Sequence, residues 1–394
     1  MRIPVFVGGA ALLASTGLAC GTHSATPPPV TTTVTVTTSV TTTPTAPPTT
    51  FTPSKPVPAA FKPLSFTAVS SGTFWLLGAT PCGNAFCPSI AHTNDGGAHF
   101  TAVPAPRAPV DLSGDTANAI ETLRFATDET GFAFDEPSFR SAGNPSAPIW
   151  ETTDGGGHWQ KLAFDDVRAF ATGGGNVYLV RGPCGETGCK NLVLSRRPLA
   201  GGAWSTTPLE VGSVDQLIDL AVHGNALWIS VSPTGGQHPF QILLRSDDDG
   251  ASFTTGTSPC TNGLGGDLEP ASAAVVWAVC PTGMLAGASR SSDGGRTWRT
   301  LDVGRELANS ARIGPASDTT AVVATGNQSE LMRTDDGGAT WVRVYPARGG
   351  FWEFLGFTDA TTGTGLRSVP SGSGGLVVTR STNGGGSWIP VAVR

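Results

Sequence analysis

One short motif recurs six times in the chain and restricts the folds that it can adopt. Each copy reads Ser/Thr-x-Asp-x-Gly-x-(Ser/Thr/His)-(Trp/Phe), with Asn in place of Asp in the last copy. The central residues are Asp95, Asp154, Asp248, Asp293, Asp336 and Asn383. Successive central residues are 59, 94, 45, 43 and 47 positions apart. Because 94 is about twice the usual spacing, a degraded seventh copy is expected near residue 200, and Ser195 to Trp204 supplies one.

The motif has the features of a hairpin turn between two strands. An Asp side chain can accept hydrogen bonds from backbone N–H groups of its own turn, and Gly supplies the positive φ of a tight turn. Short apolar runs flank each copy, such as 241–244 before one copy and 342–344 after another. Four short strands in a repeat of 40 to 60 residues are typical of a β-propeller blade. We therefore expect residues 61–394 to form an all-β, seven-bladed β-propeller of four-stranded blades.

The composition agrees with a turn-rich β protein and excludes several other classes. The 394 residues include 52 Gly and 31 Pro, and only 14% are charged. Gly and Pro are the poorest residues for helix interiors, which excludes an all-α fold or a coiled coil. No Gly-X-Y period marks a collagen. A net charge of −6 without a basic stripe argues against a nucleic-acid ligand.

The N-terminal 60 residues are of a different kind. Residues 1–20 carry Arg2, then an uncharged apolar stretch too short to span a bilayer, and end in Gly-Leu-Ala-Cys20, as in a lipoprotein signal peptide. An ordinary signal peptide is the rival interpretation. Lipid on Cys20 would leave six of the seven cysteines, an even number suited to an oxidising compartment. Residues 21–60 are rich in Thr and Pro and are expected to be a disordered linker, open to O-glycosylation.

The repeats resemble the Asp-box (BNR) repeat of sialidases, of sortilin-type receptors and of photosystem II stability/assembly factor-like propellers. The run Leu123 to Phe132, followed by Thr-Thr-Asp154-Gly-Gly, looks most like the last group. The resemblance covers 61–394. It implies that each box lies in the turn between the third and fourth strands, on the face away from the ligand. The boxes are then structural, and the Asp247 to Gly250 run is one more box rather than a calcium loop.

In the same topology, the six remaining cysteines fall in connections at the opposite face. We expect the pairs Cys82–Cys87, Cys184–Cys189 and Cys260–Cys280. A zinc site is the rival interpretation, but four-residue gaps and an exported chain disfavour it. No metal and no cofactor is expected.

Binding residues tend to lie on loops that a rigid scaffold holds, and the cysteine-bearing face gathers the longest insertion, which begins at Asp135. Charged residues of the inner strands are expected to line the central mouth beside it. The rival interpretation is that several of them cap strand ends or pair with each other. The candidate binding residues are Glu121, Arg124, Asp135, Arg140, Asp219, Glu269, Arg312, Trp352 and Glu353.

Sialidases use three Arg, a Tyr–Glu nucleophile pair and an acidic Asp, so the resemblance also allows an enzyme. The Arg-Ile-Pro motif of that family occurs here only as Arg2 to Pro4, inside the signal peptide. Tyr178 and Tyr345 are not expected at the centre. We therefore expect a noncatalytic, monomeric lipoprotein on the outer face of a bacterial cytoplasmic membrane. Its partner is a protein or a cell-envelope glycan, and the alternative is an exo-sialidase or another glycoside hydrolase.

Overall fold

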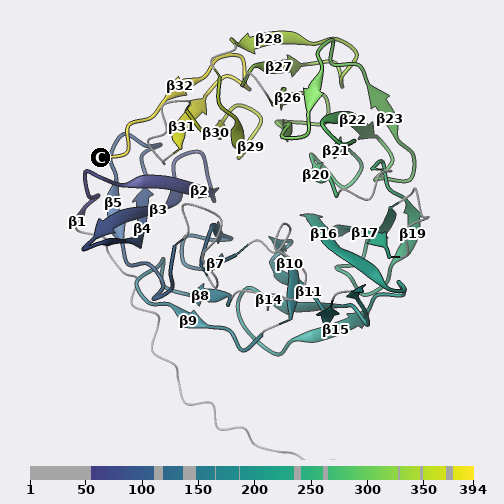
Figure 1. Cartoon of the computed structure of the whole chain (residues 1–394), viewed down its shortest axis with the longest axis horizontal. Coiled ribbons are helices and arrows are strands. Elements are labelled where there is room, and N and C mark those ends of the chain that lie inside the picture. The colour runs from purple at the N-terminus through teal and green to yellow at the C-terminus, as the bar shows by residue number, and fades with distance from the viewer. Residues whose placement is uncertain are drawn as a thin grey trace, which may run out of the picture. The chain divides into compact units, whose positions relative to one another are not determined.

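The computed structural model describes residues 55–110, 119–135, 148–164, 166–185, 187–234, 241–260, 265–326, 329–346, 349–369 and 376–394. The expected signal peptide, Cys20 and nearly all of the expected linker lie outside these residues. Within them, the strands form seven antiparallel sheets arranged around a central opening (Figure 1). The all-β class and the β-propeller architecture are thus confirmed. Across the described ranges, no helix is long and apolar enough to cross a membrane.

The first three sheets are formed by the N-terminal part of the described chain. The first sheet comprises β2 (Lys62–Ala68), β3 (Phe74–Cys82), β4 (Ala85–Thr93) and β5 (Thr101–Val103), with β1 (Lys55–Pro56) paired to β5. The second comprises β6 (Thr122–Phe125), β7 (Gly131–Phe134), β8 (Trp150–Thr152) and β9 (Gln160–Lys161). The third comprises β10 (Val167–Gly173), β11 (Asn176–Arg181), β14 (Val193–Pro198) and β15 (Ser205–Pro208).

The remaining sheets follow in chain order. The fourth comprises β16 (Val214–His223), β17 (Ala226–Pro233), β18 (Ile242–Ser246) and β19 (Thr254–Thr257), extended by the hairpin of β12 (Cys184–Gly185) and β13 (Gly188–Cys189). The fifth comprises β20 (Asp267–Pro270), β21 (Val276–Pro281), β22 (Leu285–Ser291) and β23 (Arg299–Leu301), with β24 (Leu307–Ala308) paired to β22. The sixth comprises β25 (Arg312–Pro315), β26 (Ala321–Ala324), β27 (Leu331–Thr334) and β28 (Val342–Tyr345). The seventh comprises β29 (Trp352–Phe357), β30 (Gly363–Arg367), β31 (Val377–Ser381) and β32 (Ile389–Pro390).

The sequence predicts four-stranded sheets throughout, but not all of the sheets are four-stranded. Two sheets have five strands and one has six, because connecting segments add strands at their edges. The β12–β13 hairpin leaves the third sheet and pairs with the fourth, where Cys189 lies opposite Val214. These additions are only two residues long, too short for an alternating pattern to reveal them in the sequence.

The second strands form the buried middle layer of the sheets. In β17, the run from Ala226 to Ser232 is buried throughout, and so is the whole of β26. A strand covered on both faces needs apolar residues at successive positions rather than at alternate ones. Adjacent sheets then share hydrophobic clusters, for example one that joins Leu194 of the third sheet to Leu227 and Leu244 of the fourth.

Each of the six motif copies forms a turn between the third and fourth strands of its sheet. We call these segments the box turns. In the first, the Thr93 hydroxyl donates to Asp95 Oδ1 (2.8 Å) and accepts from the Gly97 N–H (3.1 Å). Asp95 Oδ1 also accepts from the N–H of His99 (3.0 Å). The same three hydrogen bonds recur in the other five copies, with Asn383 replacing the carboxylate in the last.

The degraded seventh copy lies in the equivalent turn of the third sheet, between β14 and β15. Its Ser195 is fully buried but accepts a hydrogen bond from Arg181 (3.3 Å) in place of the turn contacts. The box turn of the fourth sheet differs in another way. Asp249 occupies the left-handed conformation (φ 57°) that Gly takes in the other copies. The Tyr178 hydroxyl donates to its carboxylate (3.1 Å), which anchors this turn to the neighbouring sheet.

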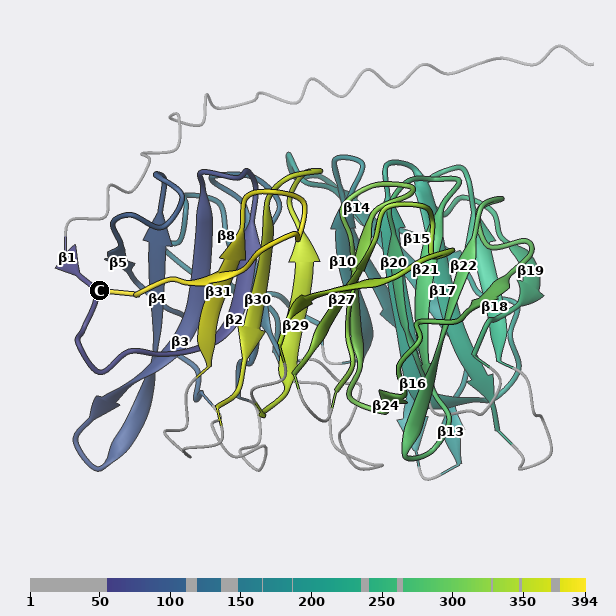
Figure 2. The same ribbon diagram turned by 90° about the horizontal axis from the view of Figure 1, so that it is seen from above.

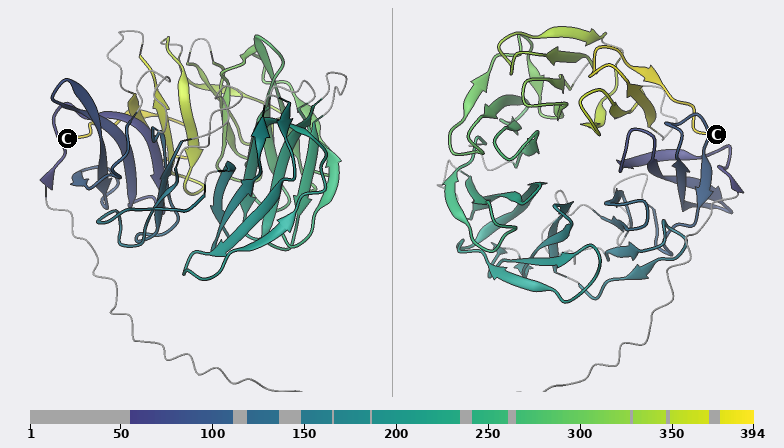
Figure 3. Two further views of the ribbon diagram at one scale, coloured as in Figure 1. Left: turned by 60° about the horizontal axis from the view of Figure 1, so that its bottom comes forward. Right: turned by 180° about the vertical axis from the view of Figure 1, so that it is seen from behind.

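The ring closes where the last sheet meets the first (Figures 1 and 3). No strand is shared between these two sheets, so side chains join them. Leu366 and Val378 pack with Phe66 and Phe74 in one cluster. Arg380 donates to the carbonyl oxygens of Gly96 (2.5 Å) and Ser71 (2.8 Å). The closure therefore depends on packing, on the buried Arg380 and on one backbone hydrogen bond, from the Leu376 N–H to the Pro63 carbonyl oxygen (3.2 Å).

The box turns predict a specific loss of stability in acid. Hydrogen bonds from the Ser252 and Thr297 hydroxyls and N–H groups lower the pKa of Asp248 and Asp293 from 3.8 to about 2. A carboxyl group with a lower pKa in the folded chain stabilises the fold above its unfolded pKa. That stabilisation is lost as the pH falls from about 4 to about 2, so we expect the Tm to fall in this window.

A variant with Asn at all five Asp positions of the box turns is the matched control. Asn383 makes the same hydrogen bonds without a charge, so the variant should fold. We expect its Tm to fall less than that of the wild type between pH 4 and pH 2. Equal falls in a thermal unfolding series, or none in the wild type, would contradict the assignment.

Candidate functional site

The inner strands of five sheets surround a cavity of about 570 Å³ within the central opening. Its lining comes mainly from β6, β10, β16, β20 and β25, with further residues from β7, β17, β21 and the connections. In every sheet except the fourth, where β13 pairs with β16, the inner strand is an edge strand with unpaired backbone groups toward this space. Among the lining residues, Gly283 and Asn309 belong to connections at one end of the ring, and Pro281 ends β21 there.

That end carries all three disulfides, and we call it the disulfide face. It consists of the connections from second to third strands and from fourth to first strands. Figure 2 shows the β3–β4 hairpin and β13 at this same end. The pairs Cys82–Cys87, Cys184–Cys189 and Cys260–Cys280 are present as expected. The Cys260–Cys280 bridge lies directly against the cavity, since a Cβ on the lining residue Gly266 would collide with Cys260 Sγ.

Four of the expected binding residues meet in the cavity: Arg124, Asp219, Glu269 and Arg312. The same space is also lined by residues that the sequence did not single out, namely Arg168, Phe170, Ser230, Gln241 and Asp267. Arg168 and Phe170 lie on the inner strand β10, and Asp267 begins the inner strand β20. Arg168 and Asp267 could have been predicted by listing every charged residue of the inner strands. Gln241 is uncharged and lies in a connection, so no charge pattern identifies it.

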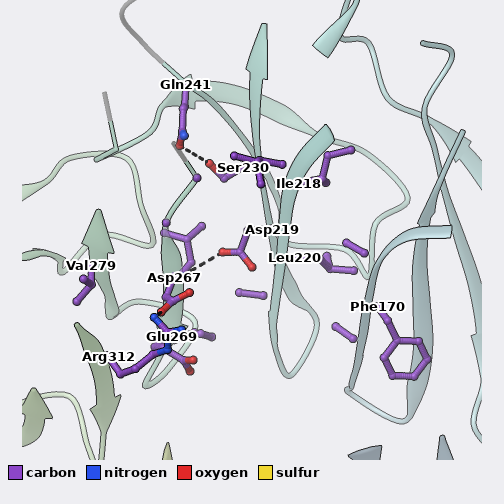
Figure 4. Close-up of a pocket in the computed structure, with 18 of the residues that line it drawn as sticks. Phe170, Ile218, Asp219, Leu220, Ser230, Gln241, Asp267, Glu269, Val279 and Arg312 are labelled. Carbon is purple, nitrogen blue, oxygen red and sulfur yellow. Dashed lines mark hydrogen bonds and ion pairs between the residues drawn. The ribbon is translucent and has the colours of Figure 1, made fainter. Parts of the chain in front are cut away.

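Carboxylates and one guanidinium form the wall made by β16, β20 and β25 (Figure 4). Arg312 forms an ion pair with Asp267 (Nη1 to Oδ2, 3.5 Å) and donates through Nε to the Glu353 carbonyl oxygen (3.4 Å). Asp219 Oδ2 accepts the N–H of Leu268 (3.1 Å), which links β16 to β20. Arg312 is thus oriented by the protein before any ligand arrives.

The other wall carries two further arginines and an apolar surface. Arg168 donates through Nε to the Gly182 carbonyl oxygen (3.0 Å), and burial lowers its pKa. Within the residues that the structure describes, the Arg124 guanidinium makes no ion pair and donates no hydrogen bond, and the side chain is half-buried. Phe170 packs on Phe134, with ring centroids 4.5 Å apart. This wall therefore offers one uncompensated positive charge beside aromatic carbon.

The remaining expected residues lie elsewhere. Trp352 is not an exposed aromatic at the mouth: it is 1% exposed, donates to the Ser329 carbonyl oxygen (2.8 Å) and packs edge-on against neighbouring rings. Glu121, Asp135 and Glu353 are not among the residues that line the cavity, and Asp135 is buried at the end of β7. Arg140 lies outside the described residues.

Large exposed apolar side chains gather on the disulfide face. Phe86 is on β4 near the tip of the β3–β4 hairpin, Met284 is in the β21–β22 turn, Leu285 begins β22, and Phe351 precedes β29. Met284 is 82% exposed, and its carbonyl oxygen accepts the N–H of the cavity residue Asn309 (3.1 Å). The other large apolar side chains found exposed, Val342 and Ile389, lie on outer strands.

Comparisons with known proteins show the fold and leave the function open. No family model matches the chain, and no curated protein sequence does. The structure of YCF48 bound to a D1 peptide is 16% identical, with a TM-score of 0.52 over 83% of this chain and 95% of that one. YCF48 from Cyanidioschyzon merolae is 15% identical, with a TM-score of 0.52 over 83% and 97%. A puromycin-hydrolysing peptidase of Mycobacterium tuberculosis is 13% identical, with a TM-score of 0.53 over 86% and 56%. Such a likeness establishes the β-propeller and not an activity.

The Cys260–Cys280 bridge is expected to stabilise the cavity wall. Its cysteines are 20 residues apart, whereas Cys82 and Cys87 are five apart. On a chain-entropy basis, removal of the longer link costs roughly 3 kcal/mol and removal of the shorter one less. We expect the Cys260→Ser/Cys280→Ser variant to lose more free energy of unfolding in urea than Cys82→Ser/Cys87→Ser. Equal losses would contradict this loop-length account.

Proposed function

We propose that the protein is a noncatalytic, lipid-anchored propeller that binds a protein ligand on its disulfide face. In this proposal each of the seven sheets is one blade, and the box turns are Asp boxes with a structural role only. The lipid on Cys20 holds the chain to the outer face of a bacterial cytoplasmic membrane, and residues 21–60 act as a tether. The ligand reaches the central cavity from the disulfide face.

The position of the exposed apolar side chains carries this proposal. Four of the six large ones lie on the disulfide face, at the first, fifth and seventh sheets, and the cavity beside the fifth sheet carries charges of both signs. Aromatic and Met side chains are enriched at protein interaction sites. The box turns use their carboxylates within the turn itself. The peptide bound to YCF48 lends support, since that propeller has a similar fold.

A glycoside hydrolase is the second candidate, because the cavity unites three arginines with Asp219, Asp267 and Glu269. Glycosidases use a pair of carboxyl groups, and sialidases add an Arg cluster and a Tyr nucleophile. Here Tyr178 is buried against Asp249, and Tyr345 packs on Trp352. Neither is among the cavity-lining residues.

Enzyme assays separate the two candidates. We expect no turnover of fluorogenic sialosides or of a panel of other fluorogenic glycosides by the purified chain. Turnover that Asp219→Asn or Glu269→Gln abolishes would replace the binding proposal with the hydrolase. The variant Glu306→Gln, at an exposed position outside the cavity lining, is the control for nonspecific effects.

Photo-crosslinking tests which face meets the ligand. A photoreactive phenylalanine analogue at Met284 or Phe351 should form adducts with another protein in the producing cells. The same analogue at Val342 or Ile389 should not, although those positions are 57% and 65% exposed. Arg124→Glu should reduce the adducts at least tenfold if the uncompensated guanidinium contacts the ligand. Adducts only from the outer strands would overturn the proposal.

The anchor is tested separately by Cys20→Ala. We expect this variant to leave the membrane fraction and appear in the soluble fraction, because a thioether-linked lipid requires the cysteine sulfur. The readout is the distribution of the chain between washed membranes and supernatant. Retention of Cys20→Ala on membranes would show that something other than lipid on Cys20 holds the protein there.

A further inference from the structure

Gln241 is a buried polar residue that the proposed function does not yet use. It precedes β18, lines the cavity and is only 2% exposed. Its Oε1 accepts hydrogen bonds from the hydroxyls of Ser230 (3.1 Å) and Ser258 (3.3 Å). The two hydroxyls lie 3.4 Å apart, and the backbone N–H of Cys260 donates to Ser258 Oγ (3.2 Å). The carboxamide is therefore held in one orientation from three elements.

The second half of this carboxamide has no protein partner. Across the described part of the chain, Gln241 Nε2 donates to no acceptor, and the atom itself is not fully buried although the residue is only 2% exposed. Because Gln241 lines the cavity, this accessible N–H group is open to it. Because both Ser hydroxyls occupy Oε1, the amide N–H groups are the part left for the cavity. This donor is rigid before any ligand binds.

A carboxylate lies beside this donor. Asp219 of β16 is directly opposite Ser230 of β17 in the register, so the two side chains share one face of the sheet. Ser230 in turn contacts Gln241 (Figure 4). Asp219 already accepts the Leu268 N–H, and a carboxylate has about four acceptor positions. The Gln241 amide donor and the Asp219 carboxylate acceptor thus both lie next to Ser230 in the cavity.

An apolar wall completes the arrangement. Phe170, Ile218 and Leu220 line the cavity, and Figure 4 shows Phe170 away from Glu269 and Arg312. No tryptophan is among the described lining residues, so the broad stacking surface that sugar rings favour is missing there. An extended peptide presents a carbonyl acceptor, an N–H donor and an apolar side chain at short intervals. Those three groups match this surface.

We propose that the cavity binds an extended peptide segment through its backbone: a carbonyl oxygen accepts from Gln241 Nε2, an N–H donates to Asp219, and an apolar side chain packs on Phe170. This inference rests on the proposed function and specifies its ligand as a linear segment of a protein. Gln241 and Asp219 select for a peptide group and not for a particular side chain. The apolar wall selects for the residue beside it.

The test uses a pool of random hexapeptides that are acetylated and amidated, so that binding cannot depend on charged termini. Peptides retained by the wild-type chain are identified by mass spectrometry, and the best binder is titrated by calorimetry. We expect Gln241→Glu to weaken that peptide at least tenfold. This variant keeps an oxygen for Ser230 and Ser258 but presents an acceptor to the cavity. Gln160→Glu, on the exposed strand β9, makes the same charge change and should bind like the wild type.

Peptide variants test whether Asp219 contacts the peptide backbone directly. Methylation of the backbone nitrogen at each position in turn should weaken binding to the wild type at least tenfold at one position. Against Asp219→Asn, which should bind the parent peptide more weakly, the same methylation should cost much less. This non-additivity is the signature of a direct contact.

Three results would overturn the inference. One is equal binding of the peptide by wild type, Gln241→Glu and Asp219→Asn. Another is retention of cell-envelope oligosaccharides in place of peptides. The third is no peptide bound with a Kd below about 1 mM. In the first and third cases, protein adducts from Phe351 would still support the disulfide face as the docking site, so the two proposals fail separately.

Discussion

A buried hydroxyl bonded to a carboxylate is the interaction on which the ring depends. Thr93 is 2% exposed, and its hydroxyl serves both the Asp95 carboxylate and the Gly97 N–H. The contact fixes the turn that leads from the third strand to the fourth, and so the register of the outer hairpin. It also places Gly97 against Phe74, where a Cβ would meet the ring at 3.1 Å. Each box turn thus ties a surface hairpin to the apolar layer of its own sheet.

The two ends of the ring differ in how their polar groups are used. At the end with the box turns, the polar groups are consumed in short internal hydrogen bonds, and little remains for a ligand. At the disulfide face the connections vary in length, and covalent links hold several of them. The β12–β13 hairpin even crosses to the next sheet, so two sheets share one clipped loop. A rigid ring with variable loops at one end is the usual arrangement for binding sites.

The repeat, the position of the box turns and the disulfide pairs could be predicted from the sequence. Each depends on the spacing of residues along the chain, and the order of strands in a propeller then determines which of them lie close together. The sequence was also sufficient for part of the cavity, since inner-strand charges such as Asp219 and Arg312 line it, although Glu353 on β29 does not. It failed for Trp352, whose indole packs between sheets instead of reaching the mouth. It failed too for Gln241, whose importance lies in which of its atoms are already bonded. Side-chain packing and hydrogen-bond satisfaction are properties of the assembled ring and leave no periodic signal.

The same cavity could serve binding or hydrolysis, and the state of its arginines favours binding. A substrate carboxylate needs guanidinium groups whose donors are available when it arrives. Arg312 is already paired with Asp267 and bonded to the Glu353 carbonyl oxygen, and Arg168 is bonded to Gly182. Only Arg124 of the three has no such contact within the described residues. Among the described lining residues, only one of the three guanidinium groups is therefore available to a ligand, whereas a sialidase uses three for the carboxylate of its substrate. The fixed amide donor and the apolar wall are groups that a segment of chain can use.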